Sequence, residues 1–182
     1  MDEIVAAALR KWPDVPHCYG WLALDARGAW RMRDERAQQL KLPGDKLNQP
    51  TLVGFINRNY ASDEHGCWYL QNGPKRVYLM LEATPFIART DPQQGLLVQT
   101  GEPLGDIERA CLTETGELIV ASGGKVAKVD DRDMAQMTEA MWLDGQPVSD
   151  EALMAWLVGG AGSLTLGPVQ GERIRQAAVA DA

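Results

Sequence analysis

The chain has 182 residues, of which 45% are hydrophobic and 24% charged, a composition typical of globular domains rather than disordered chains. Its 18 Lys and Arg against 25 Asp and Glu give a net charge of −7, which argues against nucleic-acid binding and against a basic membrane-surface patch. Three cysteines cannot all pair within one chain, and the start Met1-Asp2-Glu3 lacks the positive segment of a secretory signal. We therefore expect a cytoplasmic protein with reduced thiols.

The first third of the chain predicts two helices and a β-hairpin. Apolar residues recur at helical spacing over 4–12, and Pro13 ends this helix. The segments 19–25 and 29–33 flank a glycine-containing turn, which predicts a hairpin. A second helix is predicted from Pro50 to Tyr60. We take 1–182 as one domain, in which 1–62 forms an N-terminal helix-hairpin subdomain.

Short strands dominate the middle of the chain. Seven are predicted, over 66–71, 76–82, 86–89, 96–99, 107–113, 117–122 and 125–129. Spacing this tight leaves no room for crossover helices, so the strands should pair mainly in antiparallel fashion. Helices over 131–142 and 149–158, a strand over 163–166 and a helix from 172 onward complete the pattern.

These elements predict an α+β fold with a mainly antiparallel, bent sheet of about seven to nine strands, flanked by four or five short helices. The uncharged stretch between Glu151 and Glu172 holds several glycines and Pro168, so it is not a membrane helix. Three segments, 25–30, 63–73 and 113–123, each place a glycine two residues before a large apolar residue. A glycine turn that leads into a strand explains this pattern without a repeat architecture.

The hairpin around Asn72-Gly73-Pro74 carries the candidate binding site. Pro74 has no N–H for a ladder bond, which favours a four-residue loop that pairs Gln71 with Arg76 and Tyr69 with Tyr78. Alternation then gives one apolar core face and one polar-aromatic face. The polar-aromatic face comprises His65, Cys67, Tyr69, Gln71, Arg76, Tyr78, Met80 and Glu82. Such a face suits a ligand or a partner, although antiparallel sheets commonly keep one polar face that is simply solvated or covered by a helix. A three-residue loop would exchange the faces of one strand.

Other chemistry has weaker support. His65 and Cys67 share the polar-aromatic face, and Glu82 could orient His65, but residues two apart on a strand are marginally placed for a thiol–imidazole pair. Neither His17-Cys18 nor His65-Gly66-Cys67 has the spacing of a zinc loop, so no metal is predicted. The acidic run 130–133 suits a helix start better than a cation site. No motif indicates a cofactor.

The segments 20–30 and 71–78, together with Glu82, Thr84 and Pro85, resemble a proteobacterial protein family of unknown function about 180–190 residues long. The run 130–133 fits the same resemblance. The resemblance covers most of the chain and implies a bacterial, cytoplasmic origin, but it assigns no functional residue.

Two functions follow as hypotheses. The first is a non-catalytic cytoplasmic domain that uses the polar-aromatic face to hold a small ligand or a second copy of itself, with neither nucleic acid nor membrane as a partner. The alternative is a hydrolase or transferase with Cys67 and His65 as a nucleophile pair. The sequence defines no catalytic residue beyond this pair.

Overall fold

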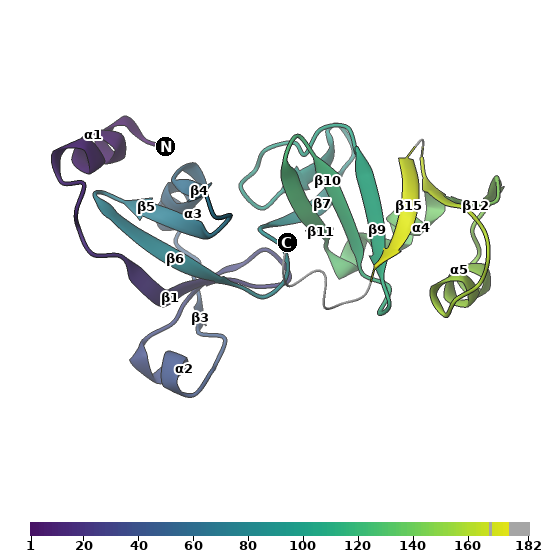
Figure 1. The fold of residues 1–182 in the computed structure, drawn as a ribbon, viewed down its shortest axis with the longest axis horizontal. Helices are drawn as coiled ribbons and strands as arrows, with labels where there is room; N and C mark the ends of the chain where they lie inside the picture. Colours follow the sequence, from purple (N-terminus) through teal and green to yellow (C-terminus); the bar gives the residue numbers. More distant parts are fainter. Residues whose placement is uncertain (168, 175–182) are drawn as a thin grey trace. The chain divides into compact units, whose positions relative to one another are not determined.

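A computed structural model describes residues 1–167 and 169–174 of the chain. Within this range it contains five short α-helices and fifteen short strands, and these strands form two sheets (Figure 1). The chain divides into two compact units, Met1–Glu82 and Ala83–Ala182. Each sheet belongs to one unit, and each unit is therefore described by itself.

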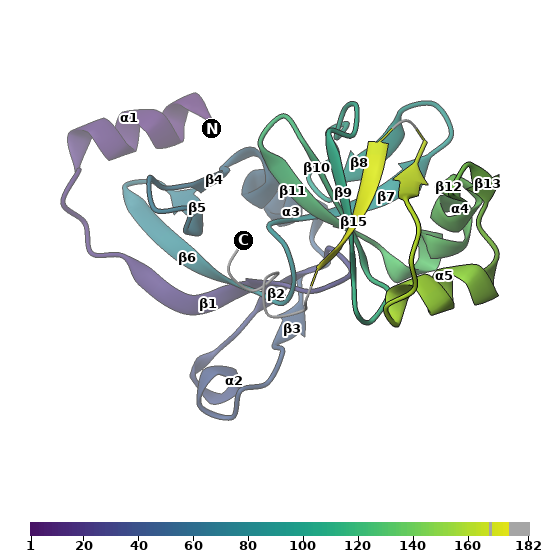
Figure 2. The same cartoon turned by 45° about the vertical axis from the view of Figure 1, so that its right-hand side comes forward.

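The N-terminal unit contains a six-stranded sheet in the order β3-β2-β1-β6-β5-β4. Its elements are α1 (Glu3–Lys11), β1 (Cys18–Leu24), β2 (Trp30–Met32), α2 (Glu35–Gln39), β3 (Asp45–Lys46), α3 (Pro50–Arg58), β4 (Tyr60–Ser62), β5 (Trp68–Asn72) and β6 (Lys75–Leu81). The pairing of β1 with β6 is parallel and the others are antiparallel. Figure 2 shows β2 and β3 following β1 at one edge of this sheet.

The core of this unit lies between α3 and one face of the sheet. Ile56 of α3 is 1% exposed, and Leu22, Leu24 and Leu70 of the sheet are also buried. Pro50 stands in the first turn of α3, where its missing N–H costs no helical hydrogen bond. The Trp30 indole N–H donates to Oδ1 of Asn57 over 2.8 Å and ties α3 to β2.

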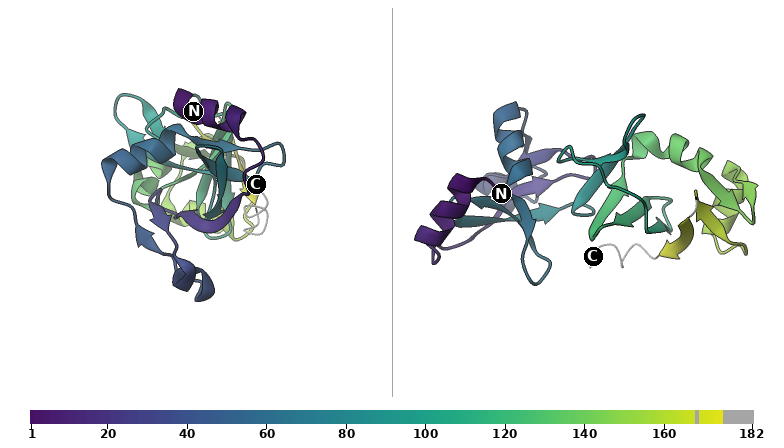
Figure 3. Two further views of the ribbon diagram at one scale, coloured as in Figure 1. Left: turned by 90° about the vertical axis from the view of Figure 1, so that its left-hand side faces the viewer. Right: turned by 90° about the horizontal axis from the view of Figure 1, so that it is seen from above.

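The C-terminal unit contains a nine-stranded sheet in the order β13-β12-β14-β15-β9-β10-β11-β7-β8. Its elements are β7 (Phe86–Asp91), β8 (Gly95–Val98), β9 (Arg109–Thr113), β10 (Leu118–Ser122), β11 (Lys125–Val129), the 3₁₀ helix η1 (Asp131–Asp133), α4 (Met134–Glu139), β12 (Met141–Leu143), β13 (Gln146–Pro147), α5 (Asp150–Leu157), β14 (Leu164–Leu166) and β15 (Val169–Ile174). Strands β7, β9, β10 and β11 supply most of its buried apolar residues, and α4 and α5 gather beside β12 (Figures 2 and 3).

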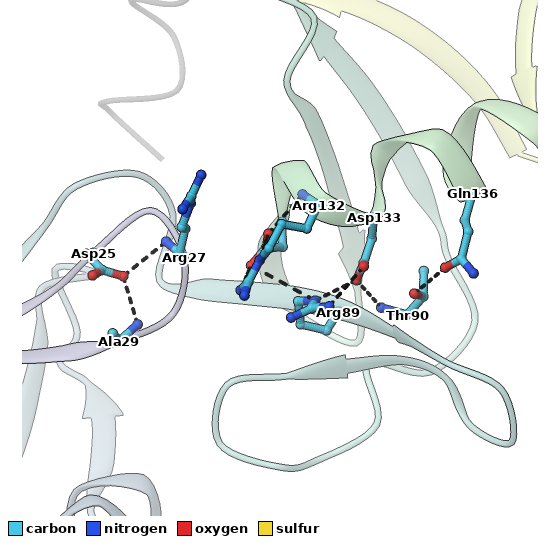
Figure 4. A network of polar contacts seen from close by, with 9 residues as sticks. Asp25, Arg27, Ala29, Arg89, Thr90, Arg132, Asp133 and Gln136 are labelled. Carbon is cyan, nitrogen blue, oxygen red and sulfur yellow. Dashed lines mark hydrogen bonds and ion pairs between the residues drawn. The ribbon is translucent and has the colours of Figure 1, made fainter. Parts of the chain in front are cut away.

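The acidic run after β11 begins a helix. Asp130 is fully buried and accepts a hydrogen bond from the backbone N–H of Arg132, as a helix N-cap does. The Asp130 carboxylate also pairs with the Arg132 guanidinium, and Asp133 pairs with Arg89 (Figure 4). The hydrogen bond from Arg132 holds the pKa of Asp130 well below its ordinary value despite burial. The interpretation of this run as a helix start is confirmed.

The predicted fold class is confirmed: the protein is α+β, with largely antiparallel sheets and five short α-helices in the described part. The strands form two sheets rather than one. Within each sheet a parallel pair joins distant parts of the chain, β1 with β6 in the first and β7 with β11 in the second. The N-terminal unit extends to Glu82 because β6 pairs with β1, whereas residues 1–62 alone would lack β5 and β6.

Several element boundaries differ from the sequence prediction. The helix predicted to reach Tyr60 ends at Arg58, and Tyr60 opens β4. Met141 lies in β12 rather than in the preceding helix, and the short α2 was not predicted. The helix predicted from 172 onward is wrong over 172–174, which belong to β15, and the remainder of it lies outside the described residues.

The three similar segments share one hairpin turn. In each, the backbone N–H of the first residue donates to the carbonyl of the fifth, and the N–H of the fourth donates to the carbonyl of the first. The side-chain oxygen of the first residue also accepts a hydrogen bond from the N–H of the fifth. The fourth residue is a glycine with φ near +80°, the conformation required in such three-residue loops. These turns begin at Asp25, Asp63 and Thr113. The weak sequence repetition therefore reflects repeated turn chemistry.

Candidate functional site

The hairpin of β5 and β6 has the predicted register. Tyr69 pairs with Tyr78 and Gln71 with Arg76, so the two faces are those expected from the sequence. Asn72 also pairs with Lys75, and the loop therefore contains Gly73 and Pro74 rather than four residues. Gly73 has φ +56°, and Pro74 occupies a loop position where no ladder N–H is needed.

Aromatic contacts organise the polar-aromatic face. The Tyr78 ring stacks on the Tyr19 ring with centroids 5.1 Å apart, and the Arg76 guanidinium lies 4.6 Å from the centre of the Tyr69 ring. The Tyr78 hydroxyl donates to Oδ2 of Asp63 over 3.0 Å. Tyr69 is buried, whereas Tyr19 is 64% exposed. Part of this face is thus internal, whereas the Tyr19–Tyr78 stack and Met80, which is 53% exposed, lie open.

The ionisation of Arg76 and that of Tyr78 influence each other on this face. A hydrogen bond with Tyr78 raises the pKa of Arg76. The same bond favours the Tyr78 phenolate, but burial and the hydrogen bond to Asp63 outweigh it and raise the pKa of Tyr78 above 10.0. Arg76 therefore remains a cation and Tyr78 a neutral hydroxyl near neutral pH.

Gln71 is fully buried on the same face. Its side-chain amide donates to the carbonyl of Gly73 over 2.8 Å, while its Oε1 has no hydrogen-bond partner among the described residues. Gln71 thus supports the hairpin loop from within the unit and offers no exposed group to a ligand.

The other predicted site residues lie apart from this cluster. His65 and Cys67 belong to the turn between β4 and β5, where their backbone N–H groups donate to Oδ1 of Asp63. The His65 ring approaches Glu64 at 3.5 Å and is largely exposed. Glu82 accepts a hydrogen bond from the backbone N–H of Ala26. In the described part of the chain, no hydrogen bond or ion pair links His65 to Cys67 or Glu82.

The opposite face of the same sheet contains a cavity of about 430 Å³. It lies between α3 and the sheet, and its lining is mostly apolar. Leu22, Ile56 and Leu70 are buried and line it, together with Leu52, Phe55 and Val77. A concave, largely apolar space of this size matches the dimensions of small-molecule sites in proteins.

A β-bulge brings Trp21 to this cavity. Tyr19 pairs with Tyr78 and Leu22 with Leu79, so Gly20 and Trp21 are additional residues on β1. Gly20 has φ +77°, and the Trp21 carbonyl accepts a hydrogen bond from the N–H of Arg33. Because of the bulge, the consecutive residues Trp21 and Leu22 both line the cavity, which regular alternation would prevent.

The cavity also has polar lining residues. Asn72 and Lys75, which pair at the end of the hairpin, both line it, as does the half-buried thiol of Cys18. Lys75 is the one charged residue among its described lining residues. No ion pair links Lys75 to any other residue that the structure describes.

The sequence did not predict this cavity, although it predicted an apolar core face for the hairpin that forms part of its wall. The signal was present in Gly20-Trp21, a glycine followed by an aromatic residue inside a strand pattern, which is typical of a bulge. The cavity itself depends on the parallel pairing of β1 with β6, for which the sequence carries no local signal.

The described residues contain neither a metal-binding cluster nor a membrane-spanning helix. Over residues 1–167 and 169–174, no three His, Cys, Asp or Glu side chains are grouped so that they could hold a metal ion. The His17 ring instead meets the Tyr78 ring edge-on at 5.5 Å. No helix in the described range has the length and apolar character needed to cross a membrane.

Fold and site together define an α+β protein with an apolar cavity between a helix and its N-terminal sheet. The chain belongs to the DUF2944 family, whose model, described as "Protein of unknown function (DUF2946)", matches residues 1–179. The predicted resemblance to a family of unknown function is thereby confirmed. No relative was found among curated proteins.

Two crystal structures of DUF1285 family proteins are similar to this chain. One, from Silicibacter pomeroyi DSS-3, is 14% identical, with a TM-score of 0.50 and 94% of each chain covered, which shows a common fold. The other, from Shewanella baltica OS155, is 13% identical with a TM-score of 0.44, and the match covers 64% of this chain and 88% of the other.

Proposed function

We propose that this chain is a non-catalytic, cytoplasmic small-ligand-binding protein whose ligand occupies the cavity between α3 and the six-stranded sheet. The cavity of about 430 Å³ is the observation that carries the proposal. The cavity opens to solvent, since its lining residues Trp21 and Met32 are each 41% exposed, and a bound apolar molecule would remove this apolar surface from water. The bulge at Gly20-Trp21 supports the proposal because bulges often re-aim a side chain beside a functional site.

The proposal is tested with the full chain and the apolar fluorophore N-phenyl-1-naphthylamine. We expect the fluorophore to bind, to gain intensity and to slow the alkylation of Cys18, which lines the cavity. Cys67, exposed on a turn, and Cys111, in the C-terminal unit, serve as internal controls whose alkylation rates stay constant.

A cavity-filling variant gives the matched test. Val77→Phe places a ring in the cavity and should weaken fluorophore binding at least about tenfold by steric exclusion. Val126→Phe makes the same change at a half-buried strand position of the C-terminal unit and should leave binding unchanged. Equal binding by both variants, or unprotected Cys18, would overturn the proposal.

A second candidate function is protein interaction or self-association through the polar-aromatic face. The stacked and largely exposed Tyr19 favours it, because exposed aromatic residues are enriched at protein interfaces. Sedimentation velocity would show a concentration-dependent dimer that Tyr19→Ser abolishes. A monomer at all concentrations would exclude self-association.

Catalysis by Cys67 and His65 has no comparable support. Both residues lie on an exposed turn, and none of their described contacts activates the thiol. The hydrolase or transferase hypothesis stays a prediction that thiol reactivity can test.

A further inference from the structure

Resting on the proposed function, we infer that the cavity takes an amphipathic carboxylate: an apolar body held by α3 and the sheet, and one carboxylate group bound by Lys75. The structure places Lys75, the one charged residue among the described lining residues, beside the apolar walls of the cavity, and this combination favours a ligand with an apolar body and an anionic group.

The apolar body follows from the walls of the cavity. Leu22, Ile56 and Leu70 are each at most 7% exposed and present hydrocarbon to the space. Trp21 lines the same space while 41% of its surface stays exposed, as expected of an aromatic side chain at the mouth of a site. Leu22, Ile56 and Leu70 offer no hydrogen-bond partner to the many polar groups of a sugar or a nucleotide.

The anionic group follows from Lys75. Two lysines of the C-terminal unit have carboxylate partners: Lys128 with Glu117 at 2.7 Å and Lys125 with Glu102 at 2.9 Å. Lys75 is half-buried, lines the cavity and forms no ion pair within the described residues. A carboxylate at the mouth would give its ammonium group a charge-assisted hydrogen bond.

The neighbouring groups favour a single negative charge. Asn72 pairs directly with Lys75 and lines the same cavity, so its side-chain amide can donate to the second carboxylate oxygen. No second cation lines the cavity among the described residues, and the chain as a whole carries a net charge of −7. A dianion such as a phosphate ester would lack a partner for its second charge.

The test compares three probes with one chain length: decanoate, decanol and decyltrimethylammonium, each displacing N-phenyl-1-naphthylamine below its micellar concentration. We expect decanoate to bind at least about tenfold more tightly than decanol, because the hydrogen bond to Lys75 is charge-assisted. The cationic probe should bind more weakly than decanol.

Lys75→Gln should remove the preference for decanoate and leave decanol binding intact, which also verifies that the variant is folded. Lys46→Gln, at an exposed position of β3 that does not line the cavity, should keep the preference. If the three probes bind equally to the wild-type chain, the cavity binds ligands but the carboxylate inference fails. If none of them displaces the fluorophore or protects Cys18, the proposed function fails as well.

Discussion

The buried carboxylate of Asp133 joins the start of α4 to β7. It is 6% exposed, accepts two hydrogen bonds from the Arg89 guanidinium and a third from the N–H of Thr90 (Figure 4). The bonds from Arg89 hold its pKa below the ordinary value of 3.8, although burial opposes ionisation. The ionised form is therefore favoured more strongly in the folded state than in the unfolded chain.

This difference predicts the response to acid. The stabilisation by Asp133 is complete above its unfolded pKa near 3.8 and is lost as the pH falls from there toward the lower folded pKa. At pH 7, Asp133→Asn should lower the free energy of unfolding by about 1–3 kcal/mol, because it removes charge-assisted bonds from a buried group. Urea titrations at pH 7 and pH 3 should show a smaller pH effect in the variant than in the wild-type chain.

Asp106→Asn is the matched control for this change, since Asp106 is an exposed residue of the same unit. It should keep the wild-type response to acid. Equal pH effects in Asp133→Asn and wild type would show that the Arg89–Asp133 pair contributes nothing to acid sensitivity.

The residue scale also decides the nucleophile hypothesis. Cys67 is exposed, and its turn is held by backbone bonds to Asp63 that leave the thiol without an activating contact. We expect native Cys67 to react with iodoacetamide at the rate of an unstructured cysteine peptide. A rate at least about tenfold higher, lost in His65→Ala, would instead restore the Cys–His hypothesis.

At the scale of elements, the bulge in β1 links sequence to cavity. A Cβ at Gly20 would lie 2.7 Å from Oε1 of Gln38, and the φ of +77° is unfavourable for any other L-residue. Gly66 has nearly the same φ, +78°, but open space around it. A substitution at Gly66 would therefore introduce backbone strain alone, whereas one at Gly20 would add a steric conflict with Gln38.

We therefore expect Gly66→Ala to cost about 1–2 kcal/mol of stability from strain alone. Gly20→Ala should cost more, and it should also weaken binding of N-phenyl-1-naphthylamine, because the bulge that brings Trp21 to the cavity is disturbed. Chemical denaturation and fluorophore titration of both variants provide the measurement. If Gly20→Ala and Gly66→Ala bind the fluorophore equally well, the bulge does not contribute to the binding cavity.

Local chemistry accounts for the elements that the sequence predicted well. Pro74 cannot donate a ladder bond, and this constraint led to the observed register of Tyr69 with Tyr78. Ser149 and Asp130 act as helix caps where the sequence placed helix starts. Each of these features depends on residues only a few positions apart.

The features that were missed depend on distant residues or on competing local bonds. The pairing of β1 with β6 joins residues more than fifty positions apart, so neither the cavity nor the separation into two sheets had a local signal. His65 and Cys67 fit a strand by alternation, but Asp63 accepts their N–H bonds and holds them in a turn. The short α2, capped by Asp34, lacks the periodic apolar face that a longer helix shows.

At the scale of the whole molecule, the junction between the units is short. Glu82 is bound within the N-terminal unit, where its N–H donates to the carbonyl of Leu24. Thr84 is buried within the C-terminal unit, where its hydroxyl donates to the carbonyl of Phe86 and accepts from the N–H of Lys128. Ala83 alone separates the two anchored residues, unlike the flexible linkers at which domains usually divide.

We accordingly propose that 1–182 unfolds as the single domain expected from the sequence. Cys18 reports on the N-terminal unit and Cys111 on the C-terminal unit, and neither is fully exposed in the folded chain. Pulsed alkylation along a urea titration, with each thiol quantified by mass spectrometry, should give one midpoint for both. Val120→Ala, at a fully buried position of β10, should lower both midpoints together by removing about 1–3 kcal/mol.

The matched change in the N-terminal unit is Ile56→Val, at a buried position of α3, which should likewise lower both midpoints. If Val120→Ala shifts the midpoint of Cys111 alone and Ile56→Val that of Cys18 alone, the two units fold independently. The cavity and its ligand would then stabilise Met1–Glu82 only, because a ligand stabilises just the cooperative unit that binds it. In a single domain, saturation with N-phenyl-1-naphthylamine should instead raise the Cys111 midpoint along with that of Cys18.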